Sequence, residues 1–393
     1  AANGPGPRNH GFPPGPGQGR LRRMESRPKV LILGAGIMGL CTAWALLRRG
    51  FSVHLLDQAP PPNPSGSSVD HHRLIRHAYG AQRGYMRMVD EAFHAWDRLW
   101  DDLGETWYIP TGVLALEDAG GDWLHHSRAA LRSDGRDHVD LTADAIQARF
   151  PYFSGEGVTD AFFCPVGGVL LAERIVAALA RHVVAQGAVL EVARATHVDP
   201  TRALVTLEGG ATRSADVLVV AAGPWIPRLL PEIGRRVTPS RQVVVRLEAP
   251  SAAWTHAPML LNLATEGGFY LVPPVAGTPI KIGDHSFSRQ GHPDDDRTAG
   301  PHEVERILTL ARRRIPGIER FVSLGSATCF YDVEPEERFV IEPLGTRAWV
   351  MSGFSGHGFK FGAVLGERLA RAIALPATAP TLPTWAAGQE APT

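Results

Sequence analysis

Two short apolar runs near the N-terminus are separated by an amphipathic stretch. The runs Lys29 to Leu33 and Ser52 to Leu56 have the length of buried strands. The stretch between them has helical periodicity and ends near Arg49-Gly50, where glycine favours a helix stop. This order predicts a strand, a helix and a second strand, which together form the beginning of a βαβ unit.

Later segments predict further pieces of this fold and a second sheet of another kind. Helical and β-branched segments alternate in the middle of the chain, whereas the β-rich segments after them have no helices between them and favour antiparallel pairing. A glycine-rich loop then leads into a last helix. The predicted helices cover Tyr85–Leu103 and Glu173–Gln186, and Gly187 caps the second of them. The predicted strands cover Val189–Val192, Val217–Val220, Gln242–Leu247 and Gly268–Ile282. A last helix follows the loop Gly353–Gly362 and runs through Leu369.

These patterns predict an α/β protein in which a Rossmann-type domain carries an inserted α+β domain built on an antiparallel sheet. We expect the Rossmann-type domain to be discontinuous and to comprise residues 28–100, 163–237 and 326–385. The inserted domain would comprise residues 101–162 and 238–325. Residues 1–27 predict a disordered tail, and the hypothesis that the native chain starts at Met24 follows from its position just before the first strand.

The predicted strand and helix are joined by Gly34-Ala35-Gly36-Ile37-Met38-Gly39. In such a turn the first glycine allows the bend, the second lets the backbone approach a pyrophosphate, and the third lets helix and strand pack closely. The helix N-terminus is an anion site, and Asp57 after the second strand can accept hydrogen bonds from an adenosine ribose. Gly34, Gly36, Gly39 and Asp57 thus predict a dinucleotide site, and a second turn at Gly223 could face the same cofactor.

Composition narrows the class of ligand. The chain has 393 residues, of which 44% are hydrophobic and 20% charged, and 40 basic residues balance 40 acidic ones. This balance argues against nucleic acid or an anionic membrane as a partner and favours a small neutral or zwitterionic ligand. The uncharged stretch Val30–Leu47 contains the glycine motif, which favours the nucleotide turn over a membrane span.

Cysteine usage points to a reducing compartment. Cys41, Cys164 and Cys329 cannot form a disulfide framework and lack the spacing of a metal knuckle. We therefore expect a cytoplasmic protein without a metal site. The acidic run Asp294–Asp296 lies in a polar stretch, residues 289–297, that predicts a solvated loop.

Three further segments distinguish a flavoenzyme from a NAD enzyme, since both could share the N-terminal motif. They are Arg73-Leu74-Ile75-Arg76-His77-Ala78-Tyr79-Gly80, Thr328-Cys329-Phe330-Tyr331 and Gly353-Phe354-Ser355-Gly356-His357-Gly358-Phe359-Lys360-Phe361. Together with the glycine motif they resemble the monomeric sarcosine oxidase and N-methyltryptophan oxidase group of the D-amino-acid-oxidase-like flavoproteins. The resemblance covers nearly the whole chain after Met24.

The resemblance implies FAD as the cofactor, joined to the protein by an 8α-S-cysteinyl bond at Cys329. Such a bond requires an accessible thiolate near the flavin. The loop Gly356-His357-Gly358, together with Lys360, matches the part of the family that faces the flavin edge that becomes negative on reduction. Arg73 matches a further cofactor-binding position.

The same resemblance implies a site for a substrate carboxylate and a site for O2. Arg76 and Lys360 match the pair that binds the carboxylate, and a guanidinium fork with an ammonium suits that group. Lys281 matches the lysine that promotes the reaction with O2, because a fixed positive charge stabilises superoxide. Lys29, Lys281 and Lys360 are the only lysines in the chain, and two of them fall on motif positions.

His285, Tyr270 and Tyr331 match the residues that shape the amine pocket. The predicted function is therefore an FAD-dependent oxidase of a secondary amine or amino acid, of the N-methyl or cyclic imino acid class. Hydride passes to the flavin to leave an imine, and O2 is reduced to H2O2. The alternatives are a flavin dehydrogenase with a partner as electron acceptor, a colourless NAD-dependent dehydrogenase and a non-catalytic flavin-binding protein. We expect a monomer.

The chain departs from the family pattern at three positions. His72 stands where sarcosine oxidases carry Thr, and Val69 where they carry a His associated with flavin attachment. The way in which attachment is assisted is therefore open. Ala81 stands where the family usually has Glu, and the loss of that carboxylate favours a bulkier or differently charged substrate.

Overall fold

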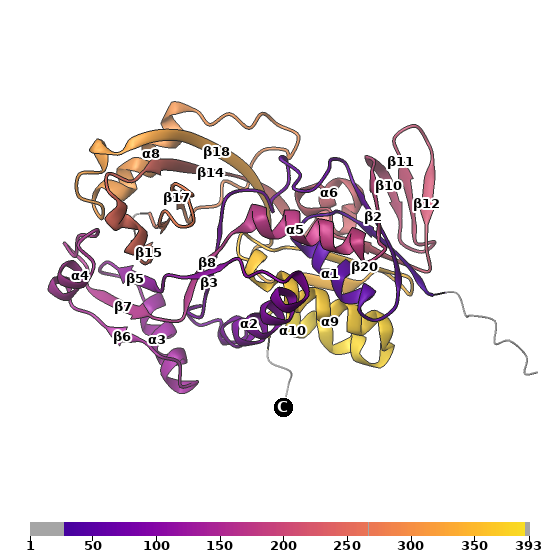
Figure 1. The fold of residues 1–393 in the computed structure, drawn as a ribbon, viewed down its shortest axis with the longest axis horizontal. Helices are drawn as coiled ribbons and strands as arrows, with labels where there is room; N and C mark the ends of the chain where they lie inside the picture. The colour runs from indigo at the N-terminus through magenta and orange to yellow at the C-terminus, as the bar shows by residue number, and fades with distance from the viewer. Residues whose placement is uncertain (1–26, 266, 390–393) are drawn as a thin grey trace, which may run out of the picture.

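The computed structural model describes residues 27–265 and 267–389. Figure 1 shows an elongated molecule with β14 and β18 towards one end and α1, α9 and β2 towards the other. The predicted tail, residues 1–27, lies outside the described residues except for Arg27.

A six-stranded sheet forms the half of the molecule that contains α1. In β1 (Lys29–Leu33) four successive residues are buried, as is typical of a parallel strand covered on both faces. Neighbouring strands are parallel except for β19 and β20. The predicted Rossmann-type fold is thus confirmed, with strands in the order β19 (Val340–Pro343), β20 (Ala348–Ser352), β13 (Val217–Val220), β1, β2 (Ser52–Asp57) and β9 (Val189–Val192).

Helices pack around the glycine-bearing helix α1 (Ile37–Leu47). Its residues 37–46 are all buried, because α5 (Ala172–Ala185) and α9 (Gly362–Ala374) pack against it. At Gly366 of α9 a Cβ would lie 2.5 Å from the carbonyl carbon of Cys41, so the two backbones are in direct contact. The C-terminal prediction was partly wrong, since α9 extends past Leu369 and is followed by α10 (Leu382–Ala386).

An eight-stranded sheet forms the other half. All its pairs are antiparallel except β5 with β15, so the predicted antiparallel sheet is confirmed with one exception. Helix α8 (Pro301–Arg312) packs on one face. In sheet order the strands are β18 (Val322–Val333), β14 (Thr238–Glu248), β17 (Ile280–Asp284), β16 (Phe269–Val272), β15 (Met259–Leu263), β5 (Val113–Glu117), β7 (Asp160–Cys164) and β6 (Val139–Asp140).

Two smaller sheets complete the described chain. One consists of β3 (Arg73–Arg76), β8 (Gly167–Leu170) and β4 (Tyr108–Pro110), and it lies at the centre of the molecule (Figure 1). The other consists of β10, β11 and β12. The bounds not yet given are Ala195–Asp199 for β10, Leu204–Leu207 for β11, Thr212–Ser214 for β12, Arg83–Leu103 for α2, Trp123–Ser133 for α3, Ala143–Arg149 for α4, Ile226–Leu229 for α6 and Pro231–Gly234 for α7.

The helices in the described ranges include none that combines the length and the apolar character of a membrane span. The uncharged stretch Val30–Leu47 instead forms β1, the glycine turn and the buried helix α1.

The contact between α1 and α9 is testable at Gly366. Replacement of glycine by alanine stabilises a helix by about 1 kcal/mol. Gly366→Ala would therefore be stabilising if there were free space beside α9. Here the new methyl group meets the backbone of α1, and we expect the free energy of unfolding to fall by about 1–3 kcal/mol in urea titrations. Arg371→Ala, at an exposed position of the same helix, should change it by less than about 0.5 kcal/mol. Equal stabilities of the two variants would contradict the close contact.

Candidate functional site

The glycine turn follows the carboxyl end of β1. Gly34 has a φ of +112°, which side-chain-bearing residues rarely adopt, and a Cβ there would collide with the backbone of Ala221. Gly39 lies behind the turn, where a Cβ would collide with the carbonyl oxygen of Gly34. The first turn of α1 has no acidic residue, so its partial positive charge is not offset there by a carboxylate. The turn can therefore receive an anionic group such as a pyrophosphate.

Asp57 lies at the end of β2 beside this turn. One carboxylate oxygen accepts a hydrogen bond from the backbone N–H of Ala35 at 2.7 Å. The other accepts hydrogen bonds from Asn63 Nδ2 at 2.8 Å and from the N–H of Ala59 at 3.2 Å. Burial raises the pKa of Asp57, and these three donors oppose the increase. The residue predicted to contact a ribose also fixes the glycine turn to the loop that follows β2.

A cleft with about 730 Å³ of empty space runs along the turn. Its lining contains the predicted residues Gly34, Gly36, Asp57 and Gly223, and also residues 66–69 of the loop that leads to β3. The structure therefore brings the predicted nucleotide-binding residues together, with Gly39 behind them.

The loop of residues 289–297 has no helix or strand and is largely exposed, as predicted, and Asp294 in it bonds residues that line this cleft. Asp294 accepts hydrogen bonds from Trp225 Nε1 at 2.7 Å, from Arg228 at 2.9 Å and from Arg194 at 2.9 Å. All three donors line the cleft. The ion pairs depend on tertiary contacts between segments distant in sequence, which is why the run of aspartates gave no indication of them.

Strand alternation directs a set of polar side chains to one face of the eight-stranded sheet. Ile280 and Ile282 of β17 pack in the apolar core with α8, which turns Lys281 to the opposite face. In the same way Phe269 and Leu271 of β16 pack in this core, so Tyr270 between them points to the other face of the sheet. The face that carries Lys281 and Tyr270 borders a second cavity with about 1100 Å³ of empty space.

Most of the predicted active-site residues line this cavity. The walls come from β3, from the eight-stranded sheet and from the C-terminal glycine loop. Cys329 and Gly358 are not among the lining residues, although Cys329 lies two positions from one of them on β18. The predicted residues in the lining are Arg73, Arg76, Tyr270, Lys281, His285, Tyr331, Gly356, His357 and Lys360.

Arg76 and Lys360 meet at Tyr79. Lys360 Nζ donates hydrogen bonds to the Tyr79 hydroxyl at 2.9 Å and to the His357 carbonyl at 2.7 Å. The Arg76 guanidinium lies 4.5 Å from the centroid of the Tyr79 ring and 5.5 Å from that of Trp123, and its buried Nε has no hydrogen-bond partner in the structure. Burial, followed by the charge of Arg76, holds the pKa of Lys360 well below its usual range. Two such cations with an unused donor suit an anion.

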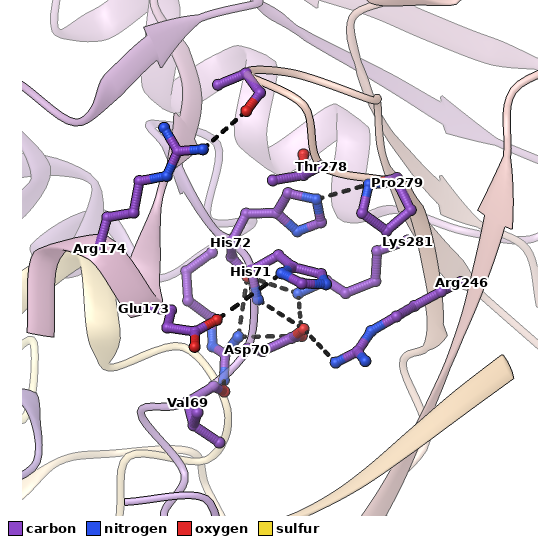
Figure 2. Close-up of polar contacts among 12 residues, drawn as sticks. Val69, Asp70, His71, His72, Glu173, Arg174, Arg246, Thr278, Pro279 and Lys281 are labelled. Atoms are coloured by element: carbon purple, nitrogen blue, oxygen red, sulfur yellow. Dashed lines mark hydrogen bonds and ion pairs between the residues drawn. The ribbon is translucent and has the colours of Figure 1, made fainter. Parts of the chain in front are cut away.

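Lys281 is held by a residue that the sequence did not indicate. Its Nζ donates to Asp70 Oδ2 at 2.9 Å and to the His72 carbonyl at 2.6 Å (Figure 2). Asp70 also accepts hydrogen bonds from Arg246 at 2.9 Å and from Arg73 at 3.3 Å. Arg246 is opposite Lys281 in the pairing of β14 with β17, so only the register of the sheet reveals this cluster.

Arg73 is anchored by hydrogen bonds to the loop that precedes it. Its guanidinium donates to the carbonyls of Ser67, Val69 and His72 at 2.7–2.9 Å, in addition to Asp70. It therefore fixes the loop between the nucleotide cleft and β3, while its stem borders the cavity.

Burial shifts the pKa values of Cys329 and His285 in opposite directions. Burial raises the pKa of the Cys329 thiol, and the cations Arg73, Lys281 and Arg297 oppose that increase. Burial lowers the pKa of His285 to about 4, so this imidazole is neutral near pH 7 and one ring nitrogen can accept a hydrogen bond.

The C-terminal glycine loop lies against Tyr331. Gly356 has a φ of +77°, and a Cβ there would collide with the Tyr331 ring. The backbone N–H of His357, predicted to face the flavin, donates to the Phe354 carbonyl at 2.9 Å within the loop. The imidazole of His357 contacts the Tyr79 hydroxyl through Nδ1 at 3.3 Å.

Comparison with known proteins agrees with this geometry. The family model described as FAD dependent oxidoreductase matches residues 29–372. The chain is 31% identical over 361 residues to monomeric sarcosine oxidase from Bacillus sp. (strain NS-129), covering 88% of this chain and 93% of that protein. It is 29% identical over 349 residues to N-methyl-L-tryptophan oxidase from Yersinia pestis (strain Pestoides F), covering 86% and 92%.

Solved structures share the fold. NikD, described as an unusual amino acid oxidase essential for nikkomycin biosynthesis, matches with a TM-score of 0.79 and 22% identity over 93% of this chain and 99% of its own. Glycine oxidase from Geobacillus kaustophilus matches with a TM-score of 0.75 and 20% identity over 89% and 95%.

The three hydrogen bonds of Asp57 predict its contribution to the cleft. In Asp57→Ala the N–H groups of Ala35 and Ala59 and the Asn63 amide lose their acceptor, so we expect the free energy of unfolding to fall by about 1–3 kcal/mol. The glycine turn would also be less ordered, and the purified variant should contain less flavin per chain. Asp101→Ala, at an exposed position on α2, is the control. If both variants kept the stability and flavin content of the unaltered protein, the role of Asp57 would be refuted.

Proposed function

The chain belongs to the FAD-dependent oxidoreductase family, and on that premise we propose that it is an oxidase of secondary amines or amino acids that carry a carboxylate. The observation that carries the proposal is the second cavity, where Arg76 and Lys360 share one wall region and Lys281 lies on the facing sheet. The N-methyl and cyclic imino acid class is the proposed range of substrates, and the product is an imine.

FAD fits the two cavities together. The N-terminus of α1, whose first turn has no acidic residue, suits its pyrophosphate. Residues 66–76 run from the lining of the nucleotide cleft to that of the second cavity. Gly34, Gly36 and Asp57 would hold the nucleotide half, and the glycine loop up to Lys360 would border the flavin half. When bound, the flavin accepts a hydride equivalent from the carbon next to nitrogen and returns its electrons to O2 as H2O2.

Arg76 and Lys360 orient the substrate by its carboxylate. The Arg76 guanidinium and the Lys360 side chain both line the cavity and can supply charge-assisted hydrogen bonds to that group. Tyr79, hydrogen-bonded to Lys360 and stacked by Arg76, keeps the two cations in a fixed relation before a substrate arrives. Such preorganisation reduces the entropy lost on binding.

The amine end of the substrate would face His285, Tyr270 and Tyr331. The neutral imidazole of His285 can accept a hydrogen bond from the amine, and its ring centroid is 5.8 Å from that of Tyr270. Burial raises the pKa of both tyrosines, so they remain protonated hydroxyls. These residues favour an uncharged amine, whose lone pair is available for the reaction.

Lys281 is the proposed site of oxygen activation, because its charge is fixed at the cavity wall. A dehydrogenase with a partner as electron acceptor is the alternative, and it would react slowly with O2. A monomeric state and a cytoplasmic location remain predictions. The division into domains also remains a proposal, with the qualification that β18 (Val322–Val333) crosses the boundary expected after residue 325.

The carboxylate site can be tested with substrates that have or lack a carboxylate. Peroxide release should be observed with some members of a panel of N-methyl and cyclic imino acids. For an active acid, Arg76→Met should lower kcat/KM by about a hundredfold, because a charge-assisted bidentate contact is lost. For the corresponding amine without the carboxylate, the variant and the unaltered enzyme should be similar. An equal loss for both substrates would show that Arg76 does not bind the carboxylate, and the absence of any amine oxidation would refute the function.

Covalent attachment at Cys329 is a separate proposal, supported by the three cations around its thiol. After acid precipitation of the purified protein, the yellow colour should stay in the pellet. Cys329→Ser should release it to the supernatant, because the hydroxyl is a far weaker nucleophile. Cys164→Ala, at a buried cysteine on β7, should keep the colour in the pellet. Release of flavin from the unaltered protein would refute the covalent bond.

A further inference from the structure

Asp70 has a backbone conformation that is costly for its residue type. Its φ is +130°, in a region that glycine occupies readily and residues with a Cβ rarely adopt. Strain of this kind persists only where the surrounding contacts require it. We therefore expect the contacts of the Asp70 carboxylate to maintain this conformation.

Those contacts gather three cations around one buried carboxylate (Figure 2). Lys281, Arg246 and Arg73 each donate to it, and the backbone N–H of His71 adds a fourth hydrogen bond at 2.8 Å. The Asp70 side chain is 11% exposed and that of Lys281 is 3% exposed. Three positive charges and one negative charge leave the cluster with a net positive charge beside the second cavity.

The buried ammonium of Lys281 depends on this carboxylate. Burial lowers its pKa to about 8, and Asp70 is the largest influence that opposes the decrease. Asp70 itself stays ionised, because the cations hold its pKa well below the usual range. The other titratable or charged groups that face Lys281 are His71 and His72 from the loop, Arg73 from β3, Arg246 from β14, Tyr270 from β16 and Cys329 from β18.

Neither histidine adds a positive charge beside Lys281. The pKa of His72 is lowered to about 3 by burial, and its ring contacts the Pro279 carbonyl at 3.2 Å. The pKa of His71 is also lowered, chiefly by burial, and its ring is 3.9 Å from Glu173. Asp70 is thus the one carboxylate in the described chain that bonds the Lys281 ammonium.

We propose that Asp70 is a positioning residue for Lys281, which it keeps charged and fixed at the cavity wall for the reaction with O2. This inference rests on the proposed oxidase function. In that reaction O2 takes two electrons from the reduced flavin and two protons to give H2O2, and the ammonium stabilises the superoxide formed after the first electron. Asp70 acts through Lys281 and does not touch the reacting atoms.

Reoxidation of the Asp70→Asn holoenzyme tests the proposal. The enzyme is reduced with dithionite without air and mixed with O2 in a stopped-flow instrument between about pH 6 and pH 10, so no substrate is needed. Loss of the opposite charge should lower the pKa that governs reoxidation by about two units. Reoxidation should therefore be slower by about tenfold or more near pH 8, and the difference should shrink towards pH 6 as Lys281 is protonated again.

Three further variants make the result decisive. Glu173→Gln, a neighbouring carboxylate without a bond to Lys281, should keep the unaltered pH profile, and Lys281→Met should be slow at every pH. If Asp70→Asn does not fold, Asp70→Gly removes the carboxylate at a position whose φ suits glycine, and it should show the same shift.

The outcomes separate this inference from the proposed function. An unaltered pH profile in the Asp70 variants, together with slow reoxidation of Lys281→Met, would overturn the role of Asp70 and leave the oxidase intact. Slow reoxidation of the unaltered enzyme, with no further loss in Lys281→Met, would overturn the oxidase function itself.

Discussion

The compensation of buried positive charge is the constraint on which the site depends. Arg73, Arg76, Lys281 and Lys360 all border one cavity, and an ionised group removed from water is costly unless it is paired or hydrogen-bonded. Asp70 compensates Lys281 and Arg73, whereas Lys360 has the Tyr79 hydroxyl and a carbonyl as acceptors, and Arg76 retains an unused Nε. One wall thus has a carboxylate among its cations, whereas Arg76 and Lys360 on the other have none as a hydrogen-bond partner. An anionic group bound beside Arg76 and Lys360 would supply the missing negative charge.

The fold holds these walls at fixed distances. Strand β3 carries Arg73 and Arg76 in the central sheet, β17 carries Lys281, and Lys360 precedes α9, the helix that packs backbone to backbone on α1. The contact between α1 and α9 therefore ties the glycine turn of the nucleotide cleft to the loop that ends the second cavity. A single extended ligand can bind in both cavities only if the packing of α1 on α9 holds the two cavities in a fixed relative position.

Much of this was predictable from the sequence, since local signals determine the glycine turn, the strands β1, β2, β9 and β13 of the parallel sheet, and the helices α1, α2 and α5, whereas β19 and β20 were not predicted. The family resemblance, which the comparisons confirm, supplied the residues of the second cavity, although their individual roles stay predictions. Asp70 and Asp294 were missed because their partners are set by strand register and loop packing between distant segments. Asp57 was identified from its spacing, but its bonds to Ala35 and Asn63 depend on the conformation of the loop after β2.

The departures from the family pattern are concentrated in the loop that contains Asp70. Val69 stands where the relatives carry a histidine associated with flavin attachment, and neither His71 nor His72 replaces it, since their rings lie against Glu173 and the Pro279 carbonyl. Arg73, Lys281 and Arg297 instead surround the Cys329 thiol with positive charge. A cation lowers the pKa of a thiol whether it is a histidine, a lysine or an arginine, and here these three cations oppose the increase that burial causes. Asp70 acts in both directions, because its carboxylate raises the pKa of the Cys329 thiol and also bonds the Lys281 ammonium, which lowers it.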